Sequence, residues 1–73
     1  MAKVEIRSEI TGTVWKILVK EGDRVAEEEP LMILESMKME IALESTASGV
    51  VGKINVNEND AISAGDLACT IEE

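Results

Sequence analysis

The residue best suited to covalent chemistry is Lys38, which stands between Met37 and Met39. A free lysine amine is cationic at neutral pH, and acylation by another enzyme converts it into a longer, neutral side chain. Two flanking methionines suit a neutral, partly apolar pendant group better than a bare ammonium. We therefore predict that Lys38 is a site of covalent acylation.

The sequence around Lys38 predicts a β-hairpin whose two-residue turn is Met37-Lys38. Apolar runs at residues 31–34 and 41–43 flank this turn, and the register gathers their apolar side chains on one face. The predicted pairs are Ser36 with Met39, Glu35 with Glu40, Leu34 with Ile41, and Met32 with Leu43. Tight hairpins favour Asn-Gly, Asp-Gly or Gly-X turns, and like charges that face each other destabilise a strand pair. Residues 35–40 depart from both the turn preference and the charge preference. Such departures are expected to coincide at functional sites, so residues 35–40 form the predicted site.

Two copies of one structural unit surround this hairpin. Residues 12–35 align with residues 49–72 at an offset of 37 positions without a gap, and eight of the 24 positions are identical. The identical pairs are Gly12/Gly49, Val14/Val51, Lys16/Lys53, Ile17/Ile54, Val19/Val56, Glu21/Glu58, Asp23/Asp60 and Glu35/Glu72. Such a register predicts one domain with internal two-fold pseudo-symmetry.

Each copy has the pattern of β-strands. Period-two alternation runs from residue 15 to 20 and from 53 to 57, with a bulge or a two-sided strand expected where Val14 and Val51 break it. Turns are expected at residues 21–23 and 58–60, and short strands at 24–25, 61–62, 31–36 and 67–72. Residues 2–8 and 39–45 bring the total to about eight strands. We expect an all-β sandwich or flattened barrel with adjacent termini, in which Glu28, opposite Gly65, gives the first copy a different second turn.

Length, charge and residue types limit the function. The 73 residues suffice for one domain, 1–73, and the net charge of −8 makes nucleic acid and anionic membranes unlikely partners. The absence of histidine removes the commonest general base, and a single cysteine offers no metal cluster. We therefore expect a carrier rather than an enzyme, with no metal and with Cys69 as a small core residue. No signal peptide or long apolar run is evident, which favours the cytoplasm.

The chain resembles the biotinyl/lipoyl carrier domain family. Residues 35–40 match its biotin-attachment motif, whose core is Met-Lys-Met, and residues 60–67 look like its closing turn and strand. The resemblance implies two four-stranded antiparallel sheets with Lys38 at a hairpin tip. It also implies that a biotin protein ligase attaches biotin there. Because at least one of Met37 and Met39 must face solvent at a two-residue turn, we infer that the pair shapes the surface that partner enzymes recognise. The biotin would then shuttle carboxyl groups between biotin carboxylase and carboxyltransferase sites.

Two other functions remain open. A lipoyl carrier shares this fold. A resemblance to lipoyl carriers would require an acidic residue before the lysine and a small residue after it, whereas this chain has Met37 and Met39 at these positions. A domain that accepts either lipoate or biotin is also possible. An unmodified structural module, as in efflux-pump adaptors, resembles the same sandwich but has a long helical insertion where this chain has only a tight turn.

Overall fold

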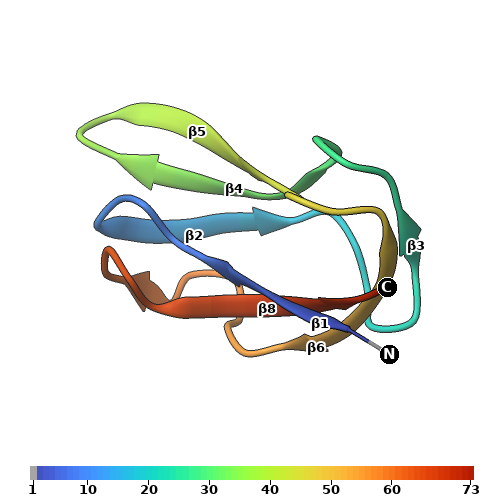
Figure 1. The fold of residues 1–73 in the computed structure, drawn as a ribbon. Coiled ribbons are helices and arrows are strands. Elements are labelled where there is room, and N and C mark those ends of the chain that lie inside the picture. The colour runs from blue at the N-terminus through green and yellow to red at the C-terminus, as the bar shows by residue number, and fades with distance from the viewer. Residues whose placement is uncertain (1) are drawn as a thin grey trace.

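The computed structural model describes residues 2–73, which form eight β-strands in two facing four-stranded antiparallel sheets (Figure 1). The terminal sheet has the order β1-β8-β6-β3, and the lysine sheet, which carries Lys38 at its edge, has the order β5-β4-β2-β7. The strands are β1 (Lys3–Arg7), β2 (Gly12–Ile17), β3 (Arg24–Val25), β4 (Pro30–Ser36), β5 (Met39–Glu44), β6 (Gly49–Ile54), β7 (Ala61–Ile62) and β8 (Leu67–Glu72). The predicted all-β sandwich of two four-stranded sheets is confirmed. Among the described residues there is no helix long and apolar enough to cross a membrane.

The predicted pseudo-symmetry relates one sheet to the other. An offset of 37 residues carries β1, β2, β3 and β4 onto β5, β6, β7 and β8, so each sheet order maps onto the other. Side-chain contacts repeat as well: a carboxylate oxygen of Glu58 accepts from the amide of Ile17 at 3.1 Å, and one of Glu21 accepts from the amide of Ile54 at 2.9 Å. The repeat therefore includes both the strand order and individual hydrogen bonds. It also extends to β1 and β5, where the two sequences match less well.

The core consists of two equivalent clusters. One contains Val14, Met32, Leu34, Ile62 and Ala68, which are 0–2% exposed. Their partners at the 37-residue offset all belong to the other cluster: Val51, Cys69, Ile71, Val25 and Leu31. The predicted core position of the small residue Cys69 is confirmed, since it is 0% exposed and matches Met32 of the other half.

Close packing also explains one pair of identical glycines. A Cβ atom on Gly12 would overlap the backbone carbonyl of Glu35, and one on Gly49 would overlap the carbonyl of Glu72. Any side chain at either position would therefore force neighbouring strands apart.

Two details differ from the expectations. The turn around Glu28 has the same geometry as the turn around Gly65: their φ values are 71° and 92°, and their amides donate to the carbonyls of Ser45 and Ser8 at 2.7 and 2.8 Å. These equivalent backbone bonds fix the turn, so Glu28 adopts the left-handed conformation despite its Cβ. Alternation from residue 15 also placed Trp15 with Ile17, yet Trp15 is 43% exposed because it is the extra residue of the predicted bulge between Val14 and Lys16.

The hairpin turn and the chain ends lie at opposite ends of the domain, which is 36 Å long (Figure 1). As predicted, the ends are adjacent: the amide of Glu73 donates to the carbonyl of Ala2 at 3.0 Å. The offset of 37 residues relates the β4–β5 hairpin to this break between β8 and β1. The Met37-Lys38 turn and the chain ends therefore occupy equivalent positions in the two halves of the sandwich.

Candidate functional site

Lys38 lies in the turn between β4 and β5, at the tip of the predicted hairpin. The predicted register is confirmed, since Ser36 pairs with Met39 and Leu34 pairs with Ile41. Met37 and Lys38 have φ values of 52° and 66°, both in the left-handed region that Asn and Gly favour in such turns. The chain therefore uses two long side chains where turn formation alone favours short ones.

The side chains at the tip face solvent. Met37 is 92% exposed and Met39 is 63% exposed, and Lys38 is also exposed. The cost of leaving these methionines in water is not offset by packing within the domain. A lysine between them is open to an enzyme that approaches along the long axis of the sandwich.

The remaining lysines lie in different settings. Lys3 and Lys53 belong to strands β1 and β6, and Lys20 precedes a turn. The ammonium of Lys16 lies 5.6 Å from the centre of the Trp15 ring, within range of a cation–π contact. None of them stands in the turn between β4 and β5, so Lys38 alone is presented at the tip of this hairpin.

The base of the hairpin is tied to the rest of the fold through Ser36. Its hydroxyl donates to the backbone carbonyl of Thr11 at 2.8 Å, and the Thr11 hydroxyl accepts from the amide of Ala64 at 3.2 Å. These bonds connect the hairpin to the β1–β2 loop and to the β7–β8 turn. Thr11 was not predicted as a site residue, because this contact joins residues far apart in the sequence.

Glu35 and Glu40 occupy the predicted positions opposite each other at the base of the hairpin, and both are exposed. Their neighbours Leu34 and Ile41 point toward the core side of the sheet, so the two carboxylates stand on its outer side. In water the repulsion between exposed like charges is small. The pair gives the outer side of the hairpin base a local negative charge.

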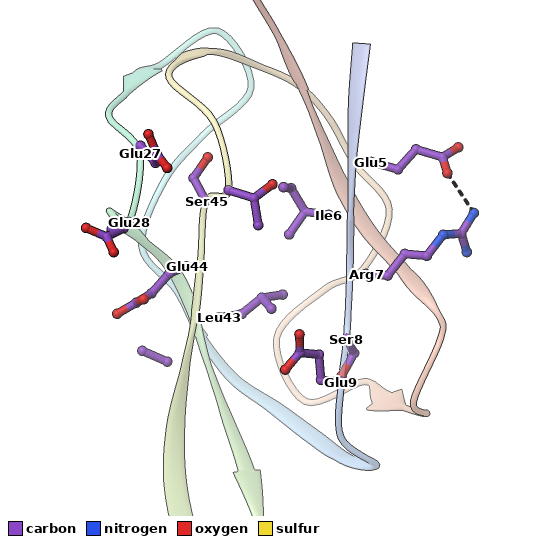
Figure 2. Close-up of a pocket in the computed structure, with 12 residues that line it drawn as sticks. Glu5, Ile6, Arg7, Ser8, Glu9, Glu27, Glu28, Leu43, Glu44 and Ser45 are labelled. Atoms are coloured by element: carbon purple, nitrogen blue, oxygen red, sulfur yellow. Dashed lines mark hydrogen bonds and ion pairs between the residues drawn. The ribbon is translucent and has the colours of Figure 1, made fainter.

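A groove of about 630 Å³ lies away from the tip, between the edge strands β1 and β5 (Figure 2). Ile6 and Leu43 point into it from the two strands, and glutamates including Glu27 and Glu44 line its rim. Its apolar floor is part of the core, since Leu43 packs against the cluster that contains Ile6. The groove is thus the seam between the two sheets, with no contact to Lys38.

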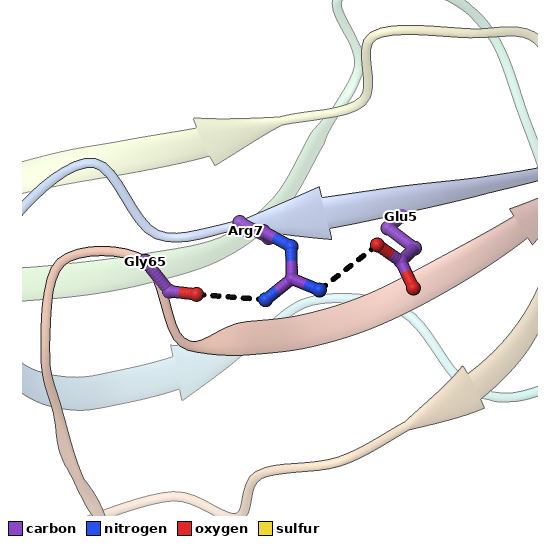
Figure 3. Close-up of polar contacts among 3 residues, drawn as sticks. All are labelled: Glu5, Arg7 and Gly65. Carbon is purple, nitrogen blue, oxygen red and sulfur yellow. Dashed lines mark hydrogen bonds and ion pairs between the residues drawn. The ribbon is translucent and has the colours of Figure 1, made fainter.

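Beside the groove, Arg7 forms a hydrogen bond with the turn that precedes β8 (Figure 3). Its guanidinium donates to the carbonyl of Gly65 at 2.8 Å and forms an ion pair with Glu5 at 2.9 Å. Both charged groups are about half exposed, so the pair contributes little to stability. The contact is structural and does not extend to the hairpin tip.

Comparisons with known proteins point to one family. A family model described as "Biotin-requiring enzyme" matches residues 2–71. The chain is 42% identical to the biotinylated protein TB7.3 homolog of Mycobacterium leprae, over 92% of this chain and 94% of that protein. It is 47% identical to the biotin carboxyl carrier protein of Streptococcus mutans, over 82% of this chain but only 46% of that protein.

Solved structures agree with the fold. The urea carboxylase of Kluyveromyces lactis contains a matching part with a TM-score of 0.92 and 36% identity, which covers 99% of this chain and 6% of that one. The lipoyl domain of the 2-oxoglutarate dehydrogenase complex of Azotobacter vinelandii matches with a TM-score of 0.81 and 26% identity, over 96% of both chains. The same sandwich thus occurs within a carboxylase and in a domain named for its lipoyl group.

Proposed function

The chain belongs to the biotin/lipoyl attachment domain family, and from this we propose that it is a biotin carboxyl carrier with biotin joined by an amide to Nζ of Lys38. Biotin attached there would supply a ring that accepts a carboxyl group at a biotin carboxylase site and releases it at a carboxyltransferase site. The relatives named as a biotinylated protein and a biotin carboxyl carrier protein support this assignment. The observation that carries the proposal is the placement of Lys38, between exposed methionines, in a turn that its residue types do not favour.

The residues at the tip fit an amide-linked biotin. An activated biotin carboxyl carbon, presented by a biotin protein ligase, would bond to Nζ of Lys38 as the activating group leaves and the ammonium loses two of its three protons to form a neutral amide. No desolvation of a packed lysine is needed, because the side chain is already exposed. Met37 and Met39 offer adaptable apolar surface beside the attached group. The Ser36–Thr11 bond holds the base of the hairpin while the long side chain moves.

Mass spectrometry tests the attachment. Incubation with a purified biotin protein ligase, biotin and ATP should raise the intact mass by one biotin less one water, and peptide mapping should place the addition on Lys38. The Lys38→Arg variant, which keeps the charge but offers no primary amine, should stay unmodified. An unchanged wild-type mass, or comparable biotin on Lys16 or Lys53, would contradict the proposal.

Lipoate is the second candidate, favoured by the match to a lipoyl domain over 96% of both chains. The two cofactors are distinguished by competition between purified biotin and lipoate ligases for the same protein, read by mass. We expect biotin to predominate on the wild type, and lipoate to gain when Met37→Asp and Met39→Ala are combined. Both substitutions change exposed side chains, so the fold should persist. An equal preference before and after the change would mean that the ligases recognise the sandwich rather than the methionines.

A further inference from the structure

The outer side of the lysine sheet carries an apolar patch formed by Trp15, Leu18, Ile33 and Ala42, called here the outer patch. Trp15 and Leu18 are 43% and 48% exposed, Ala42 is exposed and Ile33 is half-buried. Ile33 pairs with Ala42 on β5 and with Lys16 on β2, so the patch spans three neighbouring segments of the sheet.

Strand alternation places Leu18, Ile33 and Ala42 on the side away from the core. Trp15, the extra residue of the bulge, lies beside them, since its ring is 5.6 Å from the ammonium of Lys16, which pairs with Ile33. Met32 and Leu34, on either side of Ile33, are 0% and 1% exposed, so Ile33 points outward. Ile17 and Val19 pack against the two core clusters, so Leu18 between them also points outward.

The other half of the molecule shows that the fold does not require this patch. At the 37-residue offset, Trp15, Leu18, Ile33 and Ala42 correspond to Gly52, Asn55, Thr70 and Glu5 of the terminal sheet. The backbone is equivalent: the amide of Leu18 donates to the carbonyl of Leu31 at 2.9 Å, and the amide of Asn55 donates to that of Ala68 at 2.8 Å. Four apolar residues thus stand where the same backbone elsewhere carries small or polar ones.

An exposed apolar group of this kind indicates an interaction surface. The chain has one aromatic residue, and Trp15 lies in this patch rather than in the core. Tryptophan is enriched among the residues that contribute most to binding between proteins. The patch therefore has the composition of a small contact surface.

The surrounding charges and the size of the patch define its partner. Glu40, Ala42 and Glu44 alternate along β5 on the outer side, and Glu35 lies beside Glu40, so acidic groups flank the patch on its β5 side. One cation lies within the patch, since the ammonium of Lys16 is 5.6 Å from the centre of the Trp15 ring. Two copies of this chain would bring these acids together, and four side chains fall well short of the roughly 800 Å² per partner of a stable interface. The patch suits brief contact with a different protein that has an apolar surface with basic residues around it.

We propose, resting on the carrier function proposed above, that the outer patch is where a biotin carboxylase subunit docks while the tip is in its active site. Ile33 lies three residues from Ser36 at the base of the turn, roughly 10 Å along the strand. A partner that receives Lys38 therefore extends over the patch. An enzyme that binds a carbonate-type anion near the tip presents positive charge, which complements Glu35 and Glu40. A carrier must bind biotin carboxylase again in every reaction cycle, whereas it needs to meet the ligase only once.

The test exchanges patch residues for those that the other half already tolerates. The double variant Trp15→Gly and Leu18→Asn should be biotinylated by the ligase at the wild-type rate. With purified biotin carboxylase, its KM as the biotinylated substrate should rise about tenfold at unchanged kcat. The matched control, Asn55→Ala on the terminal sheet, should leave both values unchanged.

A second readout requires no turnover. Incorporation of 5-fluorotryptophan gives one ¹⁹F resonance, because Trp15 is the single tryptophan. This signal should shift or broaden when biotin carboxylase is added, and less so at high salt. An unchanged KM together with an unmoved ¹⁹F signal would overturn the proposal. A ¹⁹F signal that responds only to the ligase, only to a carboxyltransferase, or only to self-association at high protein concentration would overturn it too. Failure of the ligase to modify the wild type would instead refute the carrier function, and the ¹⁹F titration would still decide the docking surface.

Discussion

The two-residue turn that holds Lys38 should lower the stability of the domain, and replacing it should show this. Met37 and Lys38 have φ values of 52° and 66°. The left-handed conformation costs an ordinary L-residue about 1–2 kcal/mol. Asn and Gly adopt it readily, and Asn-Gly is a preferred pair for a hairpin turn of this kind. The informative variant therefore combines Met37→Asn with Lys38→Gly.

The expected gain follows from the local geometry. The relief of backbone strain at the two positions is partly offset by the greater conformational freedom that glycine gives the unfolded chain, about 0.5–1 kcal/mol. Little packing is lost, because Met37 is 92% exposed. The net stabilisation should be about 1–2 kcal/mol, and each kcal/mol should raise the Tm of a domain of this size by roughly 4–8 °C.

Thermal and urea unfolding of the unmodified proteins measure this effect. Glu28→Gly is a matched control, because Glu28 has a φ of 71° and Gly65 occupies the equivalent position, so it should also stabilise the domain. Glu40→Gly lies within strand β5 and should destabilise it. If Glu28→Gly and Glu40→Gly behave in this way but the Asn-Gly variant is no more stable than the wild type, the turn holds no strain and the reasoning is wrong.

Three further predictions concern the tip, the core and the symmetry. Lys38→Ala should abolish biotinylation and change the free energy of unfolding by no more than about 0.5 kcal/mol, whereas Leu34→Ala should cost roughly 2–5 kcal/mol in urea unfolding. Burial raises the pKa of the Cys69 thiol to about 11, whereas the thiol of the unfolded chain loses its proton from about pH 9.0. The free energy of unfolding should therefore fall by about 2–3 kcal/mol as the pH rises from below 9.0 toward 11. The Cys69→Ala variant should lack this fall. Glu21→Ala and Glu58→Ala should each cost about 1 kcal/mol, and a clear inequality would show that their equivalent bonds to backbone amides differ in strength.

The sequence was sufficient to predict most of the fold. A one-residue shift in pairing would turn every side chain of a strand to the other face, so the apolar pattern around Met37-Lys38 allowed one hairpin register. The ungapped repeat predicted the pairing of elements across the molecule, and short strands such as β3 and β7 were found at the expected residues. Both predictions depend on local periodicity, which is visible in a single sequence.

Features that depend on contacts across the molecule could not be predicted. Residue type alone predicts that the turn at Glu28 differs from that at Gly65, yet the bond from the Glu28 amide to the carbonyl of Ser45 fixes the same backbone geometry. The alternation places Trp15 with Ile17, but a bulge shifts it by one residue at a place that the sequence marks only approximately. The contact between Ser36 and Thr11 joins residues 25 positions apart and has no local pattern.

The internal symmetry separates what the fold needs from what the function needs. Where both halves carry the same or similar residues at equivalent positions, as in the two core clusters, packing is a sufficient explanation. Where the backbone is equivalent and the residues differ in kind, as at Trp15 and Gly52, the fold tolerates either, so the difference must have another cause. The repeat offers no comparison for the Met37-Lys38 turn, because the turn lies outside the two repeated units, residues 12–35 and 49–72. The positions that packing does not explain lie at the tip and on the outer side of one sheet, and a partner that holds the tip would contact both.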